Sequence, residues 1–162
     1  MYKINIVCVG KLKEKHFLSA QEEYLKRLSR FCEIKVTELN ECLLPQNPSP
    51  AQIENALDKE YLQIQPNLKG KVFVCDSRGS QFDSVMFSET LIKSFENFDT
   101  VTFVIGSSYG LSEKIKKGNT LISFSKMTFP HHLMRVFLEE QIYRAFLLKN
   151  LFVKLNKKYI KN

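Results

Sequence analysis

The sequence predicts a single α/β domain built on an open, mostly parallel β-sheet. Short runs typical of strands alternate with amphipathic runs typical of helices along the whole chain. Two of the strand-like runs, 70–75 and 101–105, are apolar at almost every position, as in strands that a parallel sheet buries on both faces. A length of 162 residues suits one domain.

The first half of the chain is expected to form two strands and two helices. Residues 3–9 are largely apolar and 33–39 alternate polar with apolar, so both runs predict strands. Between them, 14–30 places Phe, Tyr and Leu side chains among charges at helical spacing. Prolines interrupt regular structure over 45–50, and the Ser-Pro pair that ends this segment should cap and open a helix over 50–64.

The second half repeats the alternation and ends on the longest helix. Each expected strand is short and apolar, and small or polar residues follow it before the next helical pattern begins. In chain order we expect a strand over 70–75, a loop over 77–80, a helix over 83–97, a strand over 101–105, helical turns over 112–117, a strand over 121–124, and a helix from Pro130 to about residue 149.

Composition and charge narrow the class of protein. The net charge of +7 favours a polyanionic partner, of which nucleic acid is the commonest, although a lysine-rich C-terminus supplies part of the excess. No apolar run approaches the ~18 residues of a membrane span, and no signal peptide is evident, so we expect a cytoplasmic protein. The cysteines form no CxxC pair and only three histidines are present, which predicts reduced thiols and no metal site: Cys8, Cys32, Cys42 and Cys75.

Small and polar residues follow three of the expected strands. They occupy 75–79, 106–110 and 123–130. Open α/β sheets bind ligands beyond the carboxyl ends of their strands, and glycine there lets a ligand approach the backbone closely. The sequence therefore predicts a small-molecule site in the region 101–146, which contains two of the three loops.

One of these loops also fits a hydrolase motif. Residues 106–110 read G-x-S-x-G after a strand, which would make Ser108 a nucleophile. His131 and His132 follow, but no Asp lies after Ser108, and Glu113 is the only intervening acid. A serine hydrolase is thus a disfavoured alternative. Adjacent histidines on a helix point about 100° apart, so this pair is not expected to chelate one metal ion.

The last helix is apolar on more than one side. Such a helix is buried on several faces, and in a small domain one of those faces often meets a second subunit. We therefore expect a homodimer. The remaining charges are spaced for pairs within the helix, Arg135 with Glu139 and Glu140 with Arg144.

The chain closely resembles the RlmH (YbeA-like) methyltransferases over residues 3–149. A long string over 123–131, S-F-S-K-M-T-F-P-H, carries most of the resemblance. Shorter matches are Phe103-Val104-Ile105-Gly106, Tyr109-Gly110-Leu111, Met134-Arg135, residues 140–146, Val9-Gly10-Lys11-Leu12-Lys13, and Glu23-Tyr24 with Lys26-Arg27-Leu28.

The resemblance implies a SPOUT-class fold with a C-terminal trefoil knot, and a homodimer with its site at the subunit interface. It implies methyl transfer from S-adenosylmethionine to N3 of a pseudouridine in large-subunit (23S) rRNA, within assembled ribosomes. It does not name the catalytic base. By position, it implies that the cofactor is contacted by Cys75, Gly106, Phe124, Ser125, Lys126, Met127, Thr128 and Phe129.

Two departures from the family pattern stand out. Ser107 occupies a position where the family usually has a second glycine, which a suitable backbone conformation would tolerate. The ending also differs, because the family closes on an Arg-Gly-x-x-Tyr-His-Lys-like tail. We therefore divide the chain into a methyltransferase domain over 1–149 and an atypical basic tail over 150–162. An alternative function is an rRNA- or ribosome-binding homologue with weak or no turnover.

Overall fold

A five-stranded parallel sheet organises the chain, as its computed structural model shows for residues 1–160, with side chains described to residue 158. The strands lie in the order β2-β1-β4-β3-β5, and every pair is parallel, which confirms the predicted sheet. The strands are β1 (Tyr2–Val9), β2 (Cys32–Leu39), β3 (Lys71–Gln81), β4 (Thr100–Ile105) and β5 (Thr120–Ser123). The helices are α1 (Lys15–Leu28), α2 (Pro50–Ile64), a short 3-10 helix (Gln65–Asn67), α3 (Ser84–Ser94), α4 (Glu113–Lys116) and α5 (His131–Ile160).

Helices cover both faces of the sheet. On one face, α5 packs with α1 and α3 over a core that includes Ile4, Ile6 and Phe103. On the other face, Val7 and Val104 pack with side chains from α2 and α4. Successive residues of a strand point to opposite faces, so a strand covered on both sides must be apolar throughout. This explains the continuous apolar runs in β3 and β4.

The start of α2 matches its sequence signal. The Ser49 hydroxyl accepts a hydrogen bond from the Gln52 backbone N–H at 3.1 Å, and the Gln52 side chain accepts one from the Ser49 N–H at 2.9 Å. Pro50 occupies the first turn, where no N–H is needed. This reciprocal capping box fixes the point at which the chain leaves the proline-rich segment.

The expected loop over 77–80 is wrong, because β3 continues to Gln81. The strand contains an irregularity at which Cys75 and Ser80 both pair with Ile122 of β5. Gly79 sits against β5 so closely that an added Cβ would lie 2.7 Å from the Ile122 nitrogen. Strand β3 thus changes register along β5, and polar residues continue it because β5 supplies the hydrogen-bonding partner.

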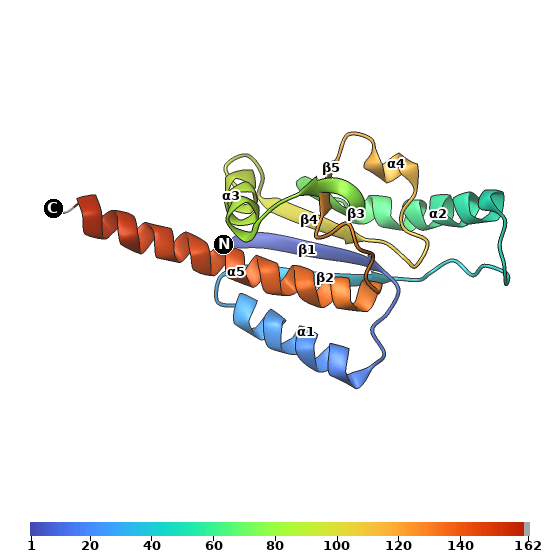
Figure 1. Cartoon of the computed structure of the whole chain (residues 1–162), viewed down its shortest axis with the longest axis horizontal. Helices are drawn as coiled ribbons and strands as arrows, with labels where there is room; N and C mark the ends of the chain where they lie inside the picture. Colours follow the sequence, from blue (N-terminus) through green and yellow to red (C-terminus); the bar gives the residue numbers. More distant parts are fainter. Residues whose placement is uncertain (161–162) are drawn as a thin grey trace.

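Helix α5 is longer than expected and reaches Ile160 instead of ending near 149. Residues 150–160 contain neither Gly nor Pro, so nothing in the sequence stops the helix. Figure 1 shows this last part of α5 extending past the end of the sheet, away from the body of the molecule. The tail over 150–162 is therefore a continuation of the last helix as far as residue 160.

One expected ion pair on α5 is wrong and the other is confirmed. Arg135 is buried and reaches out of its helix, where its Nη1 lies 2.7 Å from Glu38 Oε2 and its Nη2 donates to the Gly10 carbonyl at 3.1 Å. It does not pair with Glu139, because burial turns the guanidinium toward groups on β2 and the loop after β1. Arg144 does bind Glu140, with its Nε 3.0 Å from Glu140 Oε1.

Within residues 1–160, no helix combines the length and apolar character needed to cross a membrane.

Candidate functional site

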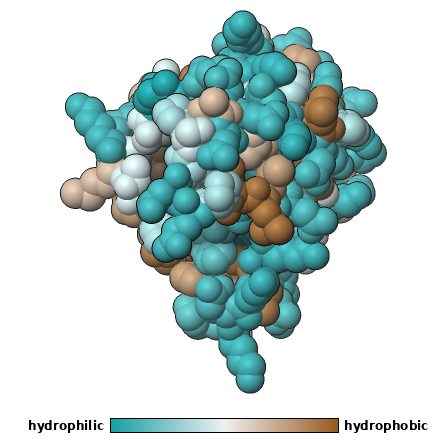
Figure 2. Space-filling model, turned by 90° about the vertical axis from the view of Figure 1, so that its right-hand side faces the viewer, coloured by the Kyte–Doolittle hydropathy of each residue, from teal (hydrophilic) through white to brown (hydrophobic). Residues whose placement is uncertain are grey.

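A pocket of about 780 Å³ lies beyond the carboxyl ends of β4 and β5 and beside the second half of β3. Its walls come from residues 75–78 within β3, from the segments that follow β4 and β5, and from the first turn of α5. Its size suits a small organic ligand. Figure 2 faces this end of the molecule, where hydrophilic residues cover most of the surface and hydrophobic residues show near the middle. The three polar segments singled out in the sequence therefore meet at one place, although the first of them is part of a strand.

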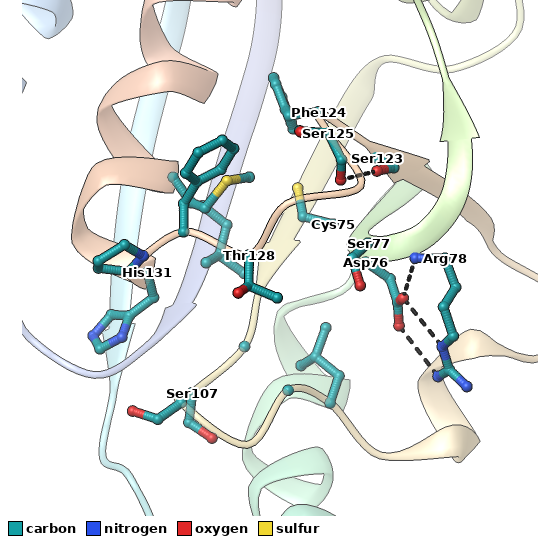
Figure 3. Close-up of a pocket in the computed structure, with 18 of the residues that line it drawn as sticks. Cys75, Asp76, Ser77, Arg78, Ser107, Ser123, Phe124, Ser125, Thr128 and His131 are labelled. Carbon is teal, nitrogen blue, oxygen red and sulfur yellow. Dashed lines mark hydrogen bonds and ion pairs between the residues drawn. The ribbon is translucent and has the colours of Figure 1, made fainter.

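Most of the residues predicted to contact a cofactor line this pocket. They are Cys75, Gly106, Phe124, Ser125, Met127, Thr128 and Phe129. Lys126 lies in the same loop, and its side chain is exposed. In the view of Figure 3, Thr128 lies between His131 on one side and Asp76 on the other. Cofactor contact by these residues stays a prediction.

The loop after β4 presents its backbone to the pocket. A Cβ added to Gly106 would lie 2.4 Å from the Gly110 carbonyl oxygen, so only glycine fits there. Gly110 has a φ of +89° and donates its N–H to the Ser107 carbonyl at 2.9 Å. This tight turn brings the backbone of Gly110 against Gly106, so any larger residue at 106 would collide with the turn itself.

Ser107 is anchored from outside the pocket. Its buried hydroxyl donates to Glu60 Oε1 at 3.1 Å, and Glu60 Oε2 accepts from the Cys42 N–H at 3.3 Å. Burial raises the pKa of Glu60 despite these two hydrogen bonds. Ser107 also has a negative φ, so a side chain causes no backbone strain where the family usually has glycine. Sequence reasoning missed Glu60, since one carboxyl in a helix resembles an ordinary surface charge.

The loop after β5 is held by its own serines. The Ser123 hydroxyl donates to the Ser125 carbonyl at 2.8 Å, and the Ser125 hydroxyl accepts from the Met127 N–H at 3.0 Å. Phe124 packs against Phe87 of the core, with ring centroids 6.4 Å apart. Met127 is 73% exposed. The loop thus has a fixed base and an open apolar edge.

An ion-pair cluster forms the opposite wall. Lys116 Nζ lies 2.9 Å from Asp76 Oδ2, and both side chains are only 11% exposed. Arg78 Nε lies 3.4 Å from the other carboxylate oxygen of Asp76, and Arg78 Nη2 is 3.1 Å from Glu113. Burial alone would raise the pKa of Asp76, but hydrogen bonds from Lys116 and Arg78 outweigh it and lower that pKa to about 2. This wall therefore carries two cations paired with two carboxylates.

Two histidines close the pocket at the start of α5. His131 and His132 are half-buried, with ring centroids 4.0 Å apart. Burial, followed by the neighbouring His132, lowers the pKa of His131. His132 Nδ1 lies 3.6 Å from Glu14. His131 is consequently neutral near pH 7 and is able to accept a proton.

The residues of the alternative hydrolase site are not assembled. Ser108 is exposed, and none of the hydrogen bonds found in residues 1–160 joins its hydroxyl to a histidine. Cys75 is no nucleophile either, because burial raises the pKa of its thiol to about 12. Across the same described part of the chain, no three His, Cys, Asp or Glu side chains group as metal ligands. The pocket is thus suited to holding a ligand by shape and backbone contacts.

Comparisons with known proteins give a consistent result. A family model described as "Predicted SPOUT methyltransferase" matches residues 2–151. The chain is 46% identical over 145 residues to the ribosomal RNA large subunit methyltransferase H of Caldicellulosiruptor bescii, with 88% of this chain and 92% of that protein covered. It is 42% identical over 151 residues to the protein of the same name from Streptococcus uberis, covering 91% and 95%.

Proposed function

Since this chain belongs to the SPOUT methyltransferase family, we propose that it is an rRNA methyltransferase that uses S-adenosylmethionine to methylate N3 of a pseudouridine in large-subunit rRNA. The relatives' names support the rRNA methyltransferase activity. The donor and the target atom rest on the resemblance of residues 103–146 to that family. The proposal includes a knotted C-terminal segment, a cytoplasmic location, and action on assembled ribosomes.

The tight glycine turn over 106–110, on the wall of a pocket of about 780 Å³, is the observation that carries the proposal. The pocket is large enough for a nucleoside-sized group. Backbone groups of 106–110 would hold the adenine and ribose, and the apolar edge at Met127 and Phe129 would cover the ring. When bound, S-adenosylmethionine would supply an electrophilic methyl group.

The residues of the pocket would align the acceptor and handle its proton. N3 must lose a proton for the methylated base to be neutral. His131 is suited to accept it, because its lowered pKa leaves the imidazole unprotonated near neutral pH. Asp76 is unsuited, because Lys116 and Arg78 hold its carboxylate. Lys116 and Arg78 are themselves neutralised by Asp76 and Glu113, so this wall supplies no net positive charge for an anionic base.

The proposed homodimer is supported by apolar side chains beside the pocket. Phe137 on α5 is 40% exposed and packs edge-on against Phe129, with ring centroids 5.5 Å apart. Together with Met127 they form an apolar patch next to the loop after β5. A second copy that covered this patch would border the pocket. Sedimentation of the purified protein tests this directly, and a monomer at micromolar concentration would contradict it.

Calorimetry with S-adenosylmethionine and its demethylated product tests cofactor binding. We expect binding by the wild type and none by Gly106→Ala, whose Cβ would meet the Gly110 carbonyl. The control is Gly118→Ala, which strains the backbone at φ +77°, as Gly106→Ala does not, but places its added Cβ with no atom within 4 Å. Absence of wild-type binding at millimolar ligand would refute the proposal.

A methylation assay on ribosomes lacking the modification distinguishes the two candidate functions. Methyl incorporation at one pseudouridine supports the enzyme. Cofactor binding without incorporation supports the RNA-binding homologue, which the changed C-terminal residues after 149 favour. His131→Gln is expected to lower turnover while leaving cofactor affinity within a few-fold of the wild type.

A further inference from the structure

The end of α5 projects from the body of the molecule. We call residues 150–160 the C-terminal arm. Each residue from Asn150 to Lys158 is exposed, and Figure 1 shows that the arm lies beyond the sheet. Through Lys158, the arm therefore has few of the packing contacts that usually stabilise a helix. A separate helix of this length would be only marginally stable in water without such contacts.

The arm is basic on one side and carries exposed apolar groups on another. Lys154, Lys157 and Lys158 are spaced i, i+3 and i+4, so they share one face. Leu151 and Leu155 lie on a neighbouring face, and Phe152 lies roughly 120–160° around the helix from the lysines. All three are 40% exposed or more. From Gln141 to the end of the sequence there is no Asp or Glu. No internal ion pair can neutralise these lysines.

We propose that the C-terminal arm is an RNA-binding helix, with its lysines on phosphates. This inference rests on the proposed function, which makes RNA the substrate. Neutralising three lysines by phosphates releases condensed counterions and stabilises the complex.

A second copy of the chain is the alternative partner for the arm. Two arms could pack through Leu151 and Leu155, because the lysines lie on another face, but the six lysines of such a pair would have no acidic side chain in either arm to neutralise them. A polyanion neutralises them. The charge of the arm therefore favours RNA.

The arm would bind RNA far from the methylated base. Lys154 and Lys158 lie 23 and 27 residues after His131 on one continuous helix, which places them roughly 35–40 Å from the pocket at ~1.5 Å per residue. A single nucleotide cannot reach both sites. The arm would thus increase affinity for a large folded RNA without taking part in the methyl transfer.

Salt-dependent RNA binding by the full chain tests the arm. The probe is a hairpin of about 30 nucleotides with an unpaired loop, followed by fluorescence anisotropy at several KCl concentrations. The variant carries Lys154→Gln, Lys157→Gln and Lys158→Gln. We expect the slope of log affinity against log salt to become shallower by about 2–3, since each phosphate contact contributes roughly 0.7–0.9. We also expect affinity at low salt to fall at least about ten-fold.

The matched control removes the same charge elsewhere. It is one variant that carries Lys35→Gln on β2, Lys59→Gln on α2 and Lys69→Gln before β3. This control is expected to change the slope by less than about 1. Equal slopes for the two triple variants would overturn the proposal.

Two further measurements separate the possible failures. If Leu151→Gln with Leu155→Gln dissociates a dimer while the lysine variant binds RNA normally, the arm is a subunit contact and the proposal is wrong. Calorimetry separates the arm from the proposed function, since the arm variants should keep wild-type cofactor affinity. If the wild type binds the cofactor and the lysine variant binds RNA as well as the wild type does, only the arm proposal is refuted. If the lysine variant loses RNA binding but the wild type binds no cofactor, only the methyltransferase proposal is refuted. Circular dichroism verifies that each variant is folded.

Discussion

Glu139 on α5 is fully buried, and we expect this burial to lower the free energy of unfolding as the pH rises. Among the described residues, neither of its carboxyl oxygens has a hydrogen-bond partner. Arg135 is the cation that opposes the effect of this burial, but Glu38 and the Gly10 carbonyl bind its two terminal nitrogens, and none of its hydrogen bonds goes to Glu139. Burial raises the pKa of Glu139 to about 8, against the smaller opposing effect of Arg135. The folded protein therefore binds a proton at Glu139 that the unfolded chain releases near its ordinary pKa of about 4.5.

The direction and size of the effect follow from this difference. Below about pH 4.5 both states are protonated, and burial of Glu139 has its lowest cost. Between about 4.5 and 8 the unfolded state loses the proton first, so the free energy of unfolding falls by about 1.4 kcal/mol per pH unit. The loss from this group is about 3 kcal/mol at pH 7, and it stops growing above pH 8. This would be a large fraction of the stability of an ordinary domain.

Urea unfolding of the wild type and Glu139→Gln at pH 5, 7 and 8.5 measures the effect. Glutamine does not ionise, so the variant should gain on the wild type as pH rises, by about 3–4 kcal/mol between pH 5 and 8.5. The variant-minus-wild-type difference cancels other groups, such as His131, whose lowered pKa acts in the opposite direction. Glu140→Gln is the control, because Glu140 is paired with Arg144 at the surface. Parallel pH curves for wild type and Glu139→Gln would refute the reasoning.

Three other substitutions test the remaining features. Ser107→Ala leaves a buried oxygen of Glu60 without its donor, so we expect a loss of about 1–3 kcal/mol in urea unfolding and weaker cofactor binding by calorimetry. Unchanged values for both would contradict the anchor. Asp76→Asn should lower stability by about 2 kcal/mol at pH 7, and the difference should vanish as pH falls from about 4 to 2, since the lowered pKa stabilises only the ionised form. A pH-independent difference would point to packing. Ser49→Ala should lower the free energy of unfolding by about 1 kcal/mol, and an unchanged melting temperature would argue against the capping box.

Much of the fold could be predicted because it depends on local pattern. The apolar runs of β3 and β4 indicate strands that are buried on both faces, and the Ser49-Pro50 pair indicates the start of α2. The meeting of the loops after β4 and β5 at one pocket follows from the parallel sheet, whose strand ends share one edge. These features need no knowledge of particular tertiary contacts.

The remaining features depend on neighbours that are distant in the sequence. Residues 77–81 are a strand because β5 lies beside them, and the sequence gives no periodic sign of that pairing. Arg135 and Glu139 fit a surface pair at i, i+4, but burial separates them. Glu60 belongs to the site because α2 lies beside the loop after β4, and the sequence alone does not reveal that contact. The full length of α5 was missed because the absence of helix breakers is a weaker signal than a capping residue.

The contacts of Arg135 also have a consequence for how the chain folds during synthesis. Its guanidinium holds the Gly10 carbonyl, 125 positions earlier, and Glu38, which in turn accepts the Leu12 N–H at 2.8 Å. The loop after β1 therefore cannot take its final form until the ribosome has released residue 135. Contacts between such distant positions slow folding, because a long loop must close before they form. A nascent chain that lacks α5 should thus remain open at its N-terminal end and accessible to proteases and chaperones until translation is nearly complete.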